Sequence, residues 1–109
     1  MIMFKTGNIF DSQCEVLVNP VNCKGLSGAG LAKAFRIKFP KIHSVYQAIC
    51  QDEVIPPGYA EFLYTRYHHP KILFAFTKDH WKNPSQLEWI EQIVITIKEK
   101  CEKNEMNSI

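Results

Sequence analysis

Two segments with different apolar spacing are joined by Asn19-Pro20-Val21-Asn22-Cys23-Lys24-Gly25-Leu26-Ser27-Gly28-Ala29-Gly30. Before this stretch, residues 14–18 form a short apolar run, which is typical of a strand buried on both faces. After it, residues 31–38 carry apolar side chains at helical spacing. The joining stretch is rich in glycine, asparagine, proline and serine, so we expect a long loop from Asn19 to Gly30.

This loop has the composition of a ligand-binding loop. Glycine has no Cβ, so the main chain at Gly25, Gly28 and Gly30 can approach a ligand closely. A helix that begins near Gly30 would direct free amides at an anion, which favours a phosphate or pyrophosphate. The Asn22 carboxamide could bond to a ribose hydroxyl. The spacing fits neither a Walker loop nor Gly-x-Gly-x-x-Gly, so glycines that only form a turn are an equal alternative.

The remaining pattern predicts strands alternating with helices, hence an α/β architecture. Strands are expected over residues 1–6, 59–65 and 72–77. A second helix should restart at Pro40, with Ile42, Val45, Tyr46 and Ile49 on one face. Ser85 and Glu88 have the spacing of a capping box for a last helix. Its sheet-facing stripe is predicted to be Leu87, Ile90, Val94, Ile97 and Cys101.

Length and composition predict one soluble domain over residues 1–109, with 46% hydrophobic and 22% charged residues. The net charge of +2 neither requires nor excludes a nucleic-acid partner. The four cysteines form no Cys-x-x-Cys pair, so no metal is expected. No apolar run reaches the length of a membrane span and no signal peptide is visible, which favours the cytoplasm.

Three motifs resemble a known family. They are Gly7-Asn8-Ile9, the run Val18-Asn19-Pro20-Val21-Asn22, and Gly28-Ala29-Gly30-Leu31-Ala32. Together they resemble the N-terminal half of a macrodomain. Asn22-Cys23-x-Gly25, Phe39-Pro40 and Thr77-Lys78-x-His80-Trp81 are similar to its DNA ADP-ribosyl glycohydrolase branch, and the last of these also to terminal ADP-ribose protein glycohydrolases. The resemblance implies a three-layer α/β/α fold with a mixed, largely parallel sheet that is C-terminally incomplete.

The resemblance also implies roles for particular residues. The main chain at Asn8 and Ile9 would meet adenine, although the family often has aspartate at the first position. Asn22 would hold the distal ribose, and Lys78 would be the catalytic lysine beside its anomeric carbon. The diphosphate and ribose would be wrapped by Gly28, Ala29 and Gly30. Further ligand contacts are expected from Asn19, Cys23, Gly25, Leu31, Thr77 and His80.

Several of these residues have alternative interpretations. Without the resemblance, Lys78 would be a solvated charge at a strand end. His80 could orient a substrate group, pair with Asp79, or cap and pack locally. Trp81 is interpreted as a core or lid aromatic rather than a base-stacking platform. Two interpretations are open for Tyr64, Arg66, Tyr67 and Lys71: a patch that binds single-stranded DNA, or an ordinary strand edge. His68 and His69 are interpreted as solvated.

The family's second glycine-rich ligand loop is not found in this sequence. A truncated chain, a partner copy that completes the sheet as a homodimer, or a minimal weak binder would each explain this. The resemblance implies a glycohydrolase that removes ADP-ribose from thymidine in DNA and so reverses the action of a DarT-like toxin. It implies no cofactor for this reaction. The alternatives are a non-catalytic ADP-ribose-binding module and a protein that blocks a toxin through its surface.

Overall fold

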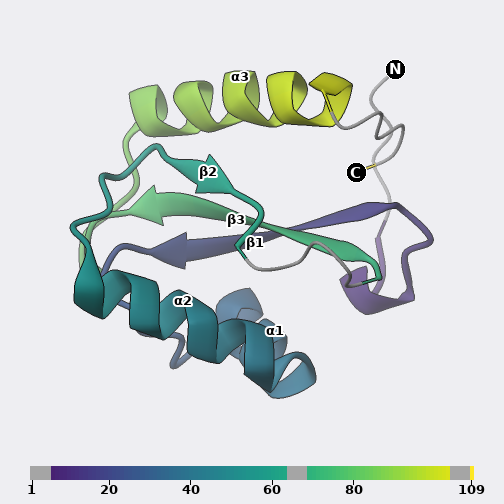
Figure 1. Ribbon diagram of the computed structural model, residues 1–109, viewed down its shortest axis with the longest axis horizontal. Coiled ribbons are helices and arrows are strands. Elements are labelled where there is room, and N and C mark those ends of the chain that lie inside the picture. Colours follow the sequence, from purple (N-terminus) through teal and green to yellow (C-terminus); the bar gives the residue numbers. More distant parts are fainter. Residues whose placement is uncertain (1–5, 64–68, 104–108) are drawn as a thin grey trace.

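A computed structural model describes residues 6–63, 69–103 and 109 of the chain. Its elements are, in order, the 3₁₀ helix η1 (Ile9–Asp11), β1 (Val16–Asn22), α1 (Gly30–Lys38), α2 (Pro40–Asp52), β2 (Ala60–Glu61), β3 (Lys71–Lys78) and α3 (Leu87–Lys103). The sheet order is β1-β3-β2, with β1 parallel and β2 antiparallel to β3. Helices α1 and α2 lie on one face and α3 on the other (Figure 1), which confirms the three-layer α/β prediction.

The central strand β3 separates two apolar cores because its side chains alternate between the faces of the sheet. Ile72, Phe74 and Phe76 point into the core under α1 and α2, where the fully buried Tyr46 stacks on Phe74 with ring centroids 5.6 Å apart. Leu73 and Ala75 point into the smaller core under α3. Strand β1 follows the same alternation, so both parallel strands are covered on both faces.

Strand β1 is longer than predicted. Asn19 to Asn22 belong to the strand and not to the loop, since the ladder with β3 continues through Pro20 opposite Ala75. Proline lacks the N–H that a central strand needs. Among the described residues β1 pairs on one side only, so Pro20 has an edge position that tolerates it. The extension carries Asn22 to the same edge of the sheet as Lys78.

Two other boundaries differ from the prediction. Strand β2 spans only Ala60–Glu61 instead of residues 59–65, of which 64 and 65 lie outside the described residues. Helix α3 begins at Leu87, one residue later than a box capped by Ser85 requires. The predicted strand over residues 1–6 and the patch residues Tyr64, Arg66 and Tyr67, like His68, also fall outside the described part, apart from Thr6. His69 is exposed, as expected.

The sheet-facing stripe of α3 was also predicted incorrectly in part. Ile93 is the buried residue, and Ile97 and Cys101 pack beside it. Leu87 and Val94 are instead 72% and 59% exposed. The helix is therefore rotated relative to the predicted stripe, because the described sheet is narrow and covers only one side of it.

Candidate ligand-binding cavity

The segment between β1 and α1 is held in shape by the Asn22 side chain. Its Oδ1 accepts from the main-chain N–H of Lys24 at 3.0 Å and of Leu26 at 3.3 Å, and its Nδ2 donates to the Leu26 carbonyl at 2.7 Å. The buried Tyr46 hydroxyl donates to the Asn22 carbonyl at 2.7 Å and lies 3.1 Å from Oδ1. An amide nitrogen carries two N–H groups, so Nδ2 keeps one donor for a ligand.

The glycines of this segment have two different functions. Gly25 has φ +77°, and a Cβ there would stand 3.3 Å from the Cβ of Cys50 on α2. Gly25 therefore packs against the protein. A Cβ at Gly28 or Gly30 would meet no atom of the described residues within 4 Å, although Gly30 has φ +61°. These two positions present open main chain.

This difference predicts unequal effects of alanine. Gly25→Ala should lower the free energy of unfolding by about 1–3 kcal/mol, because it adds left-handed strain and a close contact with α2. Gly28→Ala should change it by no more than about 0.5 kcal/mol. Urea denaturation of both variants beside the unmodified protein measures this. Equal midpoints for the two variants would contradict the packing role of Gly25.

Lys78 ends β3 directly beside this segment. The ladder shifts register after Val21, so that Asn22 is opposite Lys78, and the Cys23 N–H donates to the Lys78 carbonyl at 3.0 Å. The Thr77 hydroxyl lies 3.4 Å from the Val21 carbonyl. Lys78 is half-buried, and among the described residues no carboxylate forms an ion pair with it. Its ammonium group therefore remains available to a ligand.

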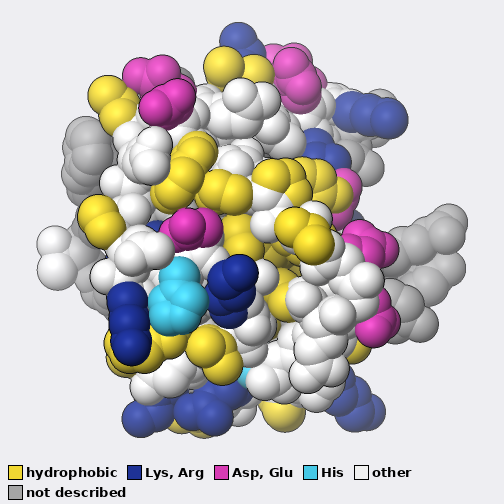
Figure 2. All heavy atoms as spheres, turned by 90° about the vertical axis from the view of Figure 1, so that its left-hand side faces the viewer, with side chains coloured by type: hydrophobic (Ala, Val, Ile, Leu, Met, Phe, Trp, Pro, Cys, Tyr) yellow, Lys and Arg dark blue, Asp and Glu magenta, His cyan; other side chains and the backbone are white. Residues whose placement is uncertain are grey.

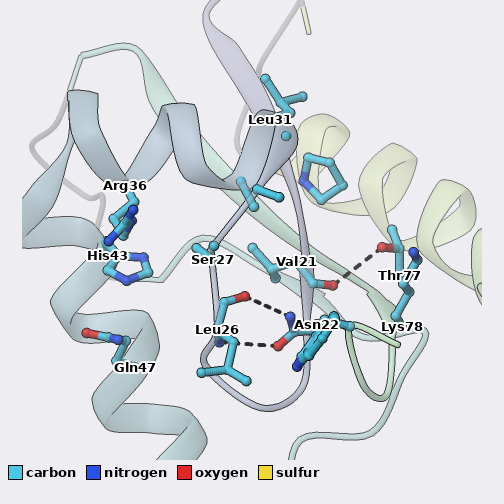
Figure 3. A pocket seen from close by; sticks show the side chains of 16 residues that line it. Val21, Asn22, Leu26, Ser27, Leu31, Arg36, His43, Gln47, Thr77 and Lys78 are labelled. Atoms are coloured by element: carbon cyan, nitrogen blue, oxygen red, sulfur yellow. Dashed lines mark hydrogen bonds between the residues drawn. The ribbon is translucent and has the colours of Figure 1, made fainter. Parts of the chain in front are cut away.

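A cavity of about 860 Å³ opens at this edge of the sheet. In Figure 3, Asn22, Thr77 and Lys78 lie on one side, Arg36, His43 and Gln47 on the other, and Leu26 and Ser27 between them. Figure 2 looks onto this edge and shows basic, acidic and hydrophobic side chains close together on it. The lining residues are Pro20, Val21, Asn22, Leu26, Ser27, Gly28, Ala29, Gly30, Leu31, Ala32, Arg36, His43, Gln47, Thr77, Lys78 and Trp81.

Seven predicted site residues therefore share one cavity. They are Asn22, Gly28, Ala29, Gly30, Leu31, Thr77 and Lys78. Six others do not line it, namely Asn8, Ile9, Asn19, Cys23, Gly25 and His80. Sequence reasoning missed the wall from α1 and α2. Arg36 lies on α1, and His43 and Gln47 lie on α2, so no single helical spacing in the sequence indicated this wall.

The residues that do not line the cavity have local structural contacts. Asn8 caps η1 by accepting from the Phe10 N–H at 2.9 Å, and Ile9 packs against the core under α1. Asn19 is 3% exposed and lines a second space of about 10 Å³ between β1 and the helices. Burial and neighbouring Cys50 raise the pKa of the Cys23 thiol to about 11, so Cys23 is a neutral core residue near pH 7. Their roles toward a ligand stay predictions.

A short turn follows Lys78. Asp79 Oδ1 accepts from the His80 N–H at 2.7 Å and from the Asn83 side chain at 3.2 Å. The latter bond is the main cause that lowers the pKa of Asp79. His80 Nδ1 accepts from the Lys82 N–H at 3.1 Å, so the capping interpretation of His80 accounts for its contacts. Trp81 is 54% exposed and stands at the cavity, which places it as a rim aromatic and not in the core.

Neither a cluster of metal ligands nor a membrane-spanning helix is found in the described part of the chain. Over residues 6–63, 69–103 and 109, no three His, Cys, Asp or Glu side chains gather as metal ligands do. None of the helices described there is long and apolar enough to cross a membrane.

Sequence comparison matches a family model, Macro domain, to residues 18–109. A DNA ADP-ribosyl glycohydrolase of Thermus aquaticus is 36% identical over 95 residues, covering 84% of this chain and 26% of the relative. The enzyme of the same name from Mycobacterium tuberculosis is 32% identical over 99 residues, covering 89% and 28%. The chain thus spans about a quarter of the length of these curated relatives.

Solved structures agree with this. The macrodomain of Mycobacterium tuberculosis DarG superposes with a TM-score of 0.84 at 28% identity, covering 97% of this chain and 71% of that one. Thermosipho africanus DarTG in complex with ADP-ribose gives 0.79 at 30% identity, covering 94% and 30%. The fold and the cavity define an α/β domain with a glycine-rich loop at the carboxyl ends of its parallel strands. The main chain of this loop is exposed to the cavity. The chain belongs to the macro domain family.

Proposed function

We propose that this domain is a DNA ADP-ribosyl glycohydrolase, which binds an ADP-ribosyl group in the cavity and removes it from thymidine in DNA. The observation that carries the proposal is the juxtaposition of Lys78 with the open main chain of Gly28–Gly30 in one cavity. Amides at a helix N-terminus are suited to a diphosphate. An amine beside them can then reach the sugar carbon. The DNA substrate is supported by the names of the relatives.

The reaction is hydrolysis of a glycosidic bond. The bond between the ribose anomeric carbon and the target base breaks, and a water oxygen ends on that carbon. The base regains a proton, and free ADP-ribose leaves. Lys78 either attacks the anomeric carbon first or guides the water to it, while the free Nδ2 donor of Asn22 orients a ribose hydroxyl. The partner implied by this activity is a DarT-like toxin, and one relative is a fusion of the transferase and the glycohydrolase.

The test is a pair of measurements on the unmodified protein. Calorimetry with ADP-ribose should give saturable binding, with adenosine as the control ligand that lacks the diphosphate. An ADP-ribosylated thymidine oligonucleotide should be converted to the free oligonucleotide and ADP-ribose. Binding without conversion would instead support a non-catalytic ADP-ribose-binding module. A protein that does neither would refute the proposed function and leave the toxin-blocking alternative.

Assembly is a separate part of the proposal. The outer edge of β1 has no strand partner among the described residues, and α3 exposes Leu87, Val94 and Ile95. An unpaired strand edge and exposed apolar side chains are both suited to contacts with a second copy, which would complete the sheet. Sedimentation should therefore detect a concentration-dependent dimer. A monomer at all concentrations would rule out this part without affecting the activity.

A further inference from the structure

One wall of the cavity has no part in the chemistry proposed for Lys78 and the Gly28–Gly30 amides. It consists of Arg36 from α1, His43 and Gln47 from α2, and Ser27 from the segment between β1 and α1, and we call it the basic wall. His43 and Gln47 are four residues apart and so share one face of α2. Figure 3 shows Arg36 next to His43, with Gln47 on the following turn. The two helices thus place Arg36, His43 and Gln47 along one side of the cavity.

The charge on this wall has no counterion in the described protein. Burial, and then the nearby Arg36 guanidinium, lower the pKa of His43. His43 is therefore neutral near pH 7, and Arg36 is the permanent cation. Over the described ranges of the chain no carboxylate forms an ion pair with Arg36. An uncompensated guanidinium at a cavity attracts an anion.

Two hydrogen-bonding side chains of the wall have few or no partners among the described residues. Ser27 is 7% exposed, and its buried Oγ has no hydrogen-bond partner in the part of the chain that the structure describes. A buried polar atom without a partner destabilises the unliganded protein, so a ligand that satisfies it is favoured. Gln47 Nε2 makes only a long 3.4 Å contact to the Gly25 carbonyl. Guanidinium, hydroxyl, amide and neutral imidazole together offer several donors and no negative charge, which suits phosphate oxygens.

We propose that the basic wall is a second anion subsite, which binds one phosphate group across the cavity from Lys78. The phosphate could be part of the ADP-ribosyl diphosphate, or a phosphodiester that neighbours the modified nucleotide in DNA. The choice between these two sources rests on the proposed function. Phosphate binding at the basic wall is independent of the proposed function.

The direct test follows the His43 ring by proton NMR during titration with inorganic pyrophosphate. The protein has four histidines, and a His43→Gln spectrum assigns the signal. Pyrophosphate should shift the His43 signal saturably and raise the pKa of its ring, since an anion stabilises the charged form. Arg36→Gln should weaken this effect about tenfold to a hundredfold. Lys38→Gln removes the same charge from the same helix outside the cavity and should bind as the unmodified protein does.

Modified ligands then identify the source of the phosphate. If the wall binds the diphosphate, Arg36→Gln loses affinity for ADP-ribose itself. If it binds a flanking phosphodiester, only the ADP-ribosylated oligonucleotide is affected, and the ADP-ribosylated nucleoside is not. An unmodified protein that binds neither refutes the proposed function, while the pyrophosphate titration still decides the subsite. No shift of His43 with pyrophosphate, or equal binding by Arg36→Gln and Lys38→Gln, overturns the subsite.

Discussion

Lys78→Met is expected to lower kcat for an ADP-ribosylated thymidine oligonucleotide by at least about 100-fold, because the side chain keeps its length but loses the amine that we propose to act at the anomeric carbon. Affinity for ADP-ribose should change by less than about threefold, since the proposed function assigns diphosphate binding to the main-chain amides and not to this lysine. Single-turnover kinetics and calorimetry measure the two quantities separately. The split between rate and affinity is what distinguishes a catalytic lysine from a binding one.

The structure makes this substitution a clean experiment. Lys78 contributes to the fold through its main chain, which accepts from Cys23 and pairs with Asn22, and methionine retains both contacts. Lys82→Met is the matched control. Lys82 also follows β3, but its ammonium lies 5.2 Å from the Trp81 ring centroid and it does not line the cavity. Unchanged turnover in Lys78→Met, or an equal loss in Lys82→Met, would remove Lys78 from the mechanism.

The sequence predicted the order of strands and helices because their apolar spacing is local. It misplaced the end of β1, because Asn19 and Pro20 have poor strand propensity. Their position is determined by pairing with β3 and by the edge location of the strand. These are long-range properties of the sheet. Local propensity could not have shown that Asn22 and Lys78 are neighbours across the ladder.

The cavity was predictable on one side only. The glycines, Asn22 and Lys78 follow strand ends, and the carboxyl ends of parallel strands meet at one edge. The opposite wall depends on how α1 and α2 are rotated against the sheet. That rotation is set by the packing of Phe35, Ile42 and Tyr46 in the core, so the inward direction of Arg36 and His43 had no local signature. Conversely, Asn19 and Gly25 are predicted ligand residues that do not line the cavity: Asn19 is buried, and Gly25 packs against Cys50 of α2.

Asn22→Ala is expected to have the largest effect on the ligand loop. Asn22 is 7% exposed and its carboxamide bonds to Lys24, Leu26 and Tyr46, so alanine removes the side-chain bonds that fix the partly buried main-chain groups of Lys24 and Leu26. We expect the free energy of unfolding to fall by about 2–3 kcal/mol. ADP-ribose affinity should fall at least about tenfold, because the amides of Gly28–Gly30 lose their fixed geometry. Urea denaturation and calorimetry measure these effects.

Asn22→Asp separates the two roles of this residue. A carboxylate still accepts from the main-chain N–H groups of Lys24 and Leu26 and from the Tyr46 hydroxyl, but it cannot donate to the Leu26 carbonyl. The free energy of unfolding of Asn22→Asp should therefore be closer to that of the unmodified protein than the value of Asn22→Ala is. Binding of a diphosphate should weaken, because the new carboxylate repels the negatively charged phosphates. Asn83→Ala removes an exposed asparagine with one side-chain bond to Asp79 and should leave both properties nearly unchanged. If Asn22→Ala were as stable as Asn83→Ala, the loop would be held by other contacts, and the preorganised amides on which the ligand site depends would have no support.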